Sequence, residues 1–373
     1  MDKKDIVIAI HQNEKLNDDA YSVISTFSKG LLKGFREIDV SAFSTTECIE
    51  KNINFNMAIG FNTTGIDYWQ KILSNNVTNI IWSVDSVFAQ NFKAVQMFSA
   101  YEKFIAFEST PADLQAVNTY IPNLKHGYIP LAADLDFWKN QPAKKENDIV
   151  YFSSMIDYEE KLQQLKETMP ELVYKLMMQI YEISSKNPNL TFWQIAEIIK
   201  KTCDLNLDVD QYILLFENIS TIIKYEQKAK MIQALSDFDV KVYGNGPWEK
   251  YIKGKVQYLG PCDVKDSIDI MNKSKISLHC HPMRLGLGLH ERILNASAAG
   301  TFSLVSDSPS IKAEFPDGFG YFNHATFEDI AQKADYYLTH EDEREEIAAK
   351  AYETTKNKHT WACRAKSIMD IVT

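Results

Sequence analysis

The feature that most constrains the fold is a repeated unit of a short apolar segment, a polar turn and an amphipathic helix. Units of this kind bury their apolar segments as parallel strands and pack the helices over the sheet. In the first third of the chain, the predicted strands are residues 6–10, 38–43, 56–60, 79–84 and 103–107. The predicted helices are residues 19–34, 66–73 and 111–120. We therefore predict a doubly wound α/β sheet in this part of the chain.

A second series of the same units begins after the polar stretch 141–148, whose composition is typical of a linker. Its predicted strands are residues 148–153, 239–244, 255–260, 275–280 and 301–306. An apolar repeat of 3.6 residues over about 158–235 predicts a helical insertion between the first two of these strands. The predicted domains are 1–140, then 148–358 with that insertion, and a terminal helix within 359–373.

Charge and composition exclude several kinds of partner. The formal net charge of −10 opposes binding to nucleic-acid phosphates and to anionic membrane surfaces. No stretch approaches the roughly 20 apolar residues of a membrane-spanning helix, and the start of the chain lacks a signal-peptide core. We expect a cytoplasmic protein without a nucleic-acid partner or integral membrane association.

The five cysteines are scattered and form no CxxC pair, which is typical of reduced thiols in a cytosolic protein. Cys280 lies between His279 and His281, but neighbouring residues of a strand point to opposite faces, so only the two histidines share a face. We expect no disulfide, no metal ion and no cofactor.

The segment 284–300 carries the clearest chemical signal, because a predicted buried strand leads into a glycine-containing loop and an Ala/Ser-rich helix. Unpaired backbone N–H groups and the dipole at a helix start favour phosphate, and open α/β sheets bind ligands beyond the carboxyl ends of their strands. An alternative is a plain turn with surface arginines and closely packed small residues. The predicted phosphate-binding residues are Arg284, Gly286, Gly288, His290 and Arg292.

Several motifs in one order resemble the C-terminal domain of group-1-type glycosyltransferases, in the spore-maturation-protein-like (CgeB-like) branch. The motifs are VYGNGPW (242–248), YLGP (258–261), SKISL (274–278) and LHERILNASAAGTFSLVSD (289–307), with fainter similarity in IIWSVDSVF (80–88) and HGYIPLAADLDFW (126–138). The resemblance implies a GT-B architecture, in which two Rossmann-like domains face each other across a cleft. It implies a nucleotide sugar on the second domain, acceptor contacts on the first, and a final helix that crosses back to the first.

The resemblance also shows where this chain departs from its relatives. Many enzymes of this kind have a glutamate that holds the nucleotide ribose, four residues after the position of Glu291, and here Asn295 stands there. An asparagine still hydrogen-bonds a ribose hydroxyl, but more weakly than a carboxylate does. A second family glutamate falls at Leu287. Because the glutamate pair is typical of retaining enzymes, our prediction leans to inversion.

Inversion requires a base that removes the acceptor proton, and two residues at strand ends are candidates. His11 follows the first strand, and its ordinary pKa of about 6.5 suits a base. Asp85 ends the fourth strand and would need a raised pKa. The alternatives are a structural loop histidine for His11 and a helix cap for Asp85.

Further donor contacts are predicted around the nucleotide. Gly244, Asn245 and Gly246 form a tight turn that could touch the nucleotide, although a structural turn explains them equally. Glu291 could accept a hydrogen bond from the sugar or ribose, or only stabilise the first turn of its helix.

We expect transfer of a hexose-type sugar from a nucleoside-diphosphate sugar, with UDP favoured, to an acceptor on a bacterial protein or surface glycan. One alternative is a nucleotide-sugar epimerase, which uses a similar two-domain fold. A second is an inactive GT-B scaffold that binds a partner, motivated by Asn295 and the helical insertion.

Overall fold

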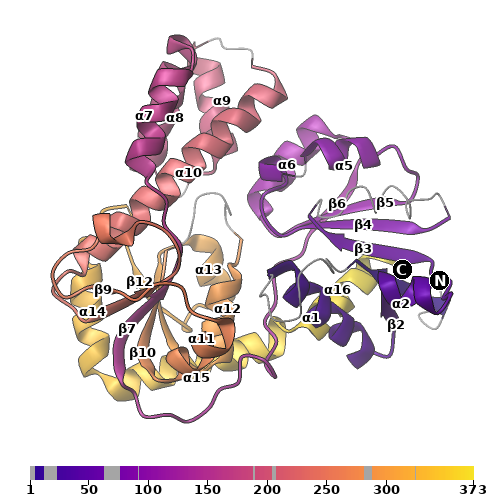
Figure 1. Cartoon of the computed structure of the whole chain (residues 1–373). Coiled ribbons are helices and arrows are strands. Elements are labelled where there is room, and N and C mark those ends of the chain that lie inside the picture. Colours follow the sequence, from indigo (N-terminus) through magenta and orange to yellow (C-terminus); the bar gives the residue numbers. More distant parts are fainter. Residues whose placement is uncertain are drawn as a thin grey trace. The chain divides into compact units, whose positions relative to one another are not determined.

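The structure, a computed structural model, describes residues 5–11, 23–62, 76–90, 92–187, 190–203, 207–280, 288–323 and 325–373 (Figure 1). The chain divides into two compact units, Met1–Asp134 with Asn357–Thr373, and Leu135–Lys356. Each unit contains a six-stranded sheet in which every strand pairing is parallel. The predicted two-domain α/β fold class is confirmed.

The first sheet has the strand order β2-β1-β3-β4-β5-β6. All five residues of β3 and of β5 are buried, which explains why apolar residues dominate both sequences. The strands are β1 (Val7–Ile10), β2 (Ser41–Ser44), β3 (Met57–Phe61), β4 (Thr78–Ser83), β5 (Phe104–Glu108) and β6 (Lys125–Tyr128). The helices of this unit are α1 (Val23–Glu37), α2 (Thr45–Glu50), α4 (Val87–Gln90), α5 (Phe92–Phe98), α6 (Pro111–Tyr120) and α16 (Trp361–Val372).

The five predicted strands of this unit are confirmed within three residues at each end, and the predicted helix at 111–120 is confirmed. Strand β6 was not predicted, because its sequence KHGY is short and mostly polar. The predicted helix at 66–73 lies outside the described residues.

The terminal helix α16 packs on α1 through two glycines. A Cβ atom on Gly30 would lie 2.3 Å from Nε1 of Trp361, and one on Gly34 would lie 2.4 Å from the Trp361 carbonyl oxygen. Thr360 caps α16 by accepting a hydrogen bond from the N–H of Cys363 at 3.4 Å. The last helix of the chain is therefore part of the first unit.

The second sheet has the order β12-β11-β10-β7-β8-β9, so the first and fourth strands of this unit, β7 and β10, are neighbours. The strand order reverses between them, which makes this the switch point of a doubly wound sheet. The strands are β7 (Asn147–Phe152), β8 (Val240–Tyr243), β9 (Gln257–Tyr258), β10 (Ser274–His279), β11 (Phe302–Ser306) and β12 (Gly320–Phe322). The five predicted strands are confirmed, and β12 was not predicted.

Four helices join β7 to β8, where the sequence predicts a helical insertion (Figure 1). They are α7 (Tyr158–Thr168), α8 (Glu171–Lys186), α9 (Phe192–Cys203) and α10 (Val209–Ala234). Near its start, α10 packs against α9 through Phe216 and Phe192, whose ring centroids are 5.0 Å apart. Near its end, Met231 and Ile232 enter the core beside the sheet. The long helix α10 thus links the insertion to the core beside the sheet.

The other helices of this unit cover the sheet or follow it in the chain. They are η2 (Trp248–Lys250), α11 (Val264–Asn272), α12 (Glu291–Ala298), α13 (Pro309–Glu314), α14 (Ile330–Thr339) and α15 (Glu341–Lys358). None of the described helices in either unit is long and apolar enough to cross a membrane.

Candidate functional site

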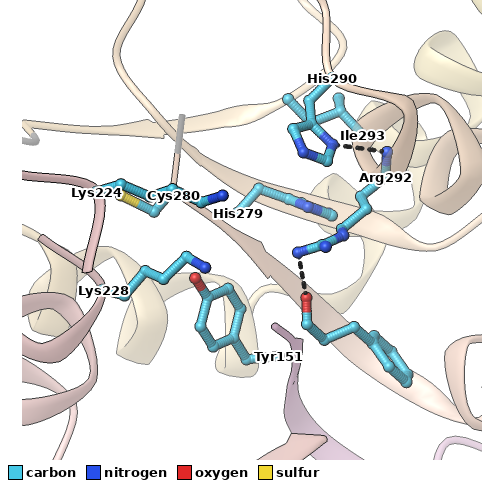
Figure 2. A pocket seen from close by; sticks show the side chains of 9 residues that line it. Tyr151, Lys224, Lys228, His279, Cys280, His290, Arg292 and Ile293 are labelled. Atoms are coloured by element: carbon cyan, nitrogen blue, oxygen red, sulfur yellow. Dashed lines mark hydrogen bonds between the residues drawn. The ribbon is translucent and has the colours of Figure 1, made fainter. Parts of the chain in front are cut away.

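A pocket lies at the carboxyl ends of β7 and β10, where the strand order of the second sheet reverses. Its walls come from both strand ends, from α10 and from the start of α12. Figure 2 shows the amine of Lys228 and the hydroxyl of Tyr151 pointing toward one another, with Arg292 entering from the opposite side. The described lining residues are Tyr151, Phe152, Lys224, Lys228, His279, Cys280, His290, Arg292 and Ile293.

Lys228 is a buried amine in this pocket, with only 5% of its surface exposed. Its Nζ donates a hydrogen bond to the carbonyl of Ser154 at 2.9 Å and lies 4.5 Å from the ring centroid of Tyr225. Burial lowers the pKa of Lys228 well below its ordinary value, and the charges of Lys224 and Arg292 lower it further. Among the described groups acting on its charge, none is a carboxylate. An anion entering the pocket would therefore meet an amine that lacks a counter-ion.

Arg292 places a second cationic group at the same edge of the sheet. Its Nη1 donates to the carbonyl of Phe152, the last residue of β7, at 2.9 Å. The Arg292 side chain remains 40% exposed. One N–H group thus anchors the guanidinium to the strand end, while the exposed part is available to a ligand.

His290 and Glu291 form a pair at the start of α12. His290 is the N-cap, and its Nδ1 lies 3.2 Å from the backbone N of Arg292 and 2.9 Å from Oε2 of Glu291. A neutral ring accepts from the backbone N–H, whereas a protonated ring donates to the carboxylate. Burial raises the pKa of Glu291, but His290 and Arg292 outweigh this effect and lower it to about 2. Glu291 is therefore ionised at neutral pH and able to accept hydrogen bonds.

His279 and Cys280 form the floor of the pocket as neutral groups. His279 is 7% exposed, and burial lowers its pKa to about 3. Its Nε2 has no hydrogen-bond partner among the described residues. Burial raises the pKa of the Cys280 thiol to about 12. Within the described ranges, no group of three or more His, Cys, Asp or Glu side chains is arranged to hold a metal ion.

The predicted donor-site residues between 284 and 295 fall into three groups. The structure brings His290 and Arg292 together in the pocket, with Glu291 between them in the chain. Asn295 is buried one helical turn after Glu291, on the same side of α12, and Gly288 precedes the helix. Two further predicted residues, Arg284 and Gly286, lie outside the described part of the chain.

Gly244, Asn245 and Gly246 form the turn after β8, and the structure shows why two of them are glycines. Their φ angles are +150° for Gly244 and +103° for Gly246. A Cβ atom at these positions would lie 2.1 Å from the Ser153 carbonyl oxygen and 1.8 Å from that of Met155. This close backbone contact is sufficient to explain both glycines without a ligand.

Sequence reasoning missed Lys224 and Lys228, because both lie in the segment assigned to the helical insertion. A signal was present: Met231 and Ile232 follow Lys228 by three and four residues, so this lysine falls on the apolar face of its helix. A lysine in that position is buried and needs an explanation.

The two candidate bases lie in the first unit, His11 directly after β1 and Asp85 two residues after the end of β4. His11 is 8% exposed, its N–H donates to the Ile59 carbonyl at 2.9 Å, and burial lowers its pKa. It is therefore neutral at physiological pH, as a base must be. Asp85 is half-buried and follows Val84, whose N–H donates to Oδ1 of Asn62 and whose carbonyl accepts from Ser109, both at 2.9 Å.

Comparison with known families gives a match in the second part of the chain. Residues 226–370 match a family described as glycosyl transferase-like. This stretch contains the end of α10 with Lys228, all of α12, and strands β8 to β12. No protein of curated function matches the chain in sequence.

Solved structures share the fold over nearly the whole chain. Sucrose-phosphate synthase from Thermosynechococcus elongatus is 8% identical, with 98% of each chain covered and a TM-score of 0.58. The chain has the GT-B fold. T4 phage β-glucosyltransferase is 10% identical, with 98% of this chain and 99% of the other covered and a TM-score of 0.57. AviGT4, a glycosyltransferase of avilamycin A biosynthesis, is 10% identical, with coverages of 98% and 97% and a TM-score of 0.52.

Proposed function

We propose that the protein transfers a hexose-type sugar from a nucleoside-diphosphate sugar, with UDP favoured, to an acceptor. The observation that carries this proposal is the group formed by Lys224, Lys228 and Arg292 at the switch point of the second sheet, with no carboxylate among the described groups that act on Lys228. Ligands of doubly wound sheets bind at this point, and a diphosphate supplies negative charge that suits this group of side chains.

The same cations would assist the chemical step. Charge accumulates on the diphosphate as the bond to the sugar breaks, and donors already held in place stabilise it without reorganisation. The Phe152 carbonyl fixes Arg292, and the Ser154 carbonyl orients the amine of Lys228. We propose that Glu291 and Asn295, one turn apart on α12, hold hydroxyl groups of the sugar and ribose.

The acceptor side of the reaction is proposed to belong to the first unit. For an inverting transfer, His11 or Asp85 would take the proton of the acceptor hydroxyl while its oxygen attacks the anomeric carbon. His11 is neutral in this structure, which favours it as the base. We propose a bacterial protein or surface glycan as acceptor, because the net charge of −10 opposes docking on nucleic acid. We also propose that the chain belongs to the spore-maturation-protein-like branch.

A thermal-shift screen with UDP-, GDP- and dTDP-hexoses tests the proposal, because a ligand that binds only the native state raises the unfolding temperature. We expect a rise with at least one of these donors, and loss of that rise in Arg292→Ala. The same donor, incubated with candidate acceptors, should release free nucleoside diphosphate. The absence of a shift with every donor would contradict the proposal, and interconversion of the sugar without acceptor would favour an epimerase.

A further inference from the structure

We propose that the side chains of Phe152 and Tyr243 form a platform on which the nucleobase of the donor stacks. This inference rests on the proposed function, because it extends the diphosphate pocket to a second subsite. The proposed base subsite lies on the side of the pocket away from β10.

The two rings already form a stacked pair at the carboxyl edge of the sheet. Phe152 ends β7 and Tyr243 ends β8, and the two residues are direct partners in the parallel register, so their side chains share one face. Their ring centroids are 5.3 Å apart and their planes differ by 18°. Both residues are only half-buried. They therefore keep exposed aromatic surface beside the pocket.

This platform is continuous with the cationic pocket. Phe152 is one of the residues that line the pocket, and its carbonyl holds the guanidinium of Arg292. Tyr243 lies on the next strand, about 4.8 Å farther along the edge and away from β10. In a doubly wound sheet, ligands bind along the carboxyl ends of the strands at the switch point. With the ribose near α12, a base directed away from β10 would pass the end of β7 and reach Tyr243 at the end of β8.

Burial in the hydrophobic core explains the presence of other aromatic residues in this unit, but it does not explain Phe152 and Tyr243. Tyr151, one residue before Phe152, is 3% exposed, and Trp248, five residues after Tyr243, is fully buried. Both belong to the hydrophobic core cluster beside the second sheet, whereas Phe152 and Tyr243 do not. A pair of partly exposed aromatic rings beside a phosphate pocket is suited to a planar base, because every base has a π-face that can stack.

The test compares the binding of UDP and of pyrophosphate, because pyrophosphate lacks the base but keeps the charges. Titration calorimetry would be performed on the full chain and on Phe152→Leu, Tyr243→Leu and Tyr243→Phe. For both leucine variants, we expect UDP affinity to fall by about 5- to 100-fold and pyrophosphate affinity to stay within about 2-fold of wild type. Tyr243→Phe keeps the ring and should retain UDP affinity.

Two results would overturn the platform while leaving the diphosphate site intact. One is unchanged UDP affinity in both leucine variants. The other is an equal loss of UDP and pyrophosphate affinity, which would show that the rings only support the pocket. A wild-type protein that binds neither ligand would overturn the proposed function, and the platform with it. Lys228→Met, which should weaken both ligands, distinguishes loss of the charge site from loss of stacking.

Discussion

At the scale of single residues, Lys228 illustrates how a buried charge can be prepared for a ligand. An amine that is removed from water and left without a carboxylate tends to lose its proton, because desolvation disfavours the charged form. The cationic neighbours Lys224 and Arg292 act in the same direction. A bound diphosphate would reverse both effects by supplying negative charge.

Donor binding should therefore be linked to proton uptake by Lys228. Its pKa is lowered in the free protein and should rise when the anion binds, so affinity should decrease as pH rises through the interval between these two values. The measurement is UDP titration between about pH 7 and 9.5, in buffers that differ in ionisation enthalpy. Lys228→Arg, which stays charged, should show a flatter pH dependence. An identical slope in wild type and Lys228→Arg would contradict this assignment.

Glu108 makes a second residue-scale prediction, about stability. This carboxyl is fully buried at the end of β5, and burial, together with the nearby Asp113, raises its pKa well above 4.5. Between the ordinary pKa of about 4.5 in the unfolded state and the higher pKa in the folded state, the folded state binds more protons than the unfolded state. Stability should therefore fall as pH rises from about 4.5 toward the folded-state pKa. Glu108→Gln should raise the urea midpoint at pH 8 more than at pH 5. The exposed Glu102→Gln is the control, and an equal effect at both pH values would refute the prediction.

At the scale of elements, the contact between α1 and α16 shows how small residues fix a terminal helix. Gly34 meets the backbone of Trp361, which cannot rotate away as a side chain could. Because a methyl group fits at this point only if the helices separate, Gly34→Ala should destabilise the first unit by about 1–3 kcal/mol.

Urea unfolding with a matched glycine would check the α1 and α16 contact. A Cβ on Gly127, in β6 of the same unit, would meet its nearest atoms at 3.7 Å, which is ordinary contact. Gly127→Ala should therefore change stability by less than about 0.5 kcal/mol. Equal stability of the two alanine variants would show that α16 does not need the close approach at Gly34.

The sequence predicts best those elements whose pattern of apolar residues matches their burial in the folded structure. Strands β3, β4 and β5 each contain a run of three or more apolar residues, and the pattern reveals them because both of their faces are buried. Strand β6 and strand β12 depend on pairing with a neighbouring strand, which four or three residues of sequence do not reveal. The two pocket lysines were missed for a similar reason, since only the return of α10 to the sheet brings Lys228 beside Arg292.

At the scale of the whole molecule, the chain repeats one architecture and places different chemistry at the strand ends of each unit. The second unit gathers cationic groups at its switch point, whereas the first has a neutral histidine after β1 and a carboxyl group after β4. Since a shared fold does not determine activity, the function must be argued from these strand ends. The central claim is that the cationic pocket of the second unit holds the diphosphate of the donor.

The most direct test is titration of UDP into wild type, Lys228→Met and Lys230→Met. Lys230 lies two residues farther along α10, is 53% exposed and pairs with Glu226, so it matches Lys228 in charge and helix but not in location. We predict that wild type and Lys230→Met bind UDP with the same affinity. Lys228→Met should bind UDP about 10- to 150-fold more weakly, which corresponds to the loss of about 1.5–3 kcal/mol expected for a charged hydrogen bond. Wild-type affinity in Lys228→Met, or no UDP binding by the unaltered protein, would contradict the claim.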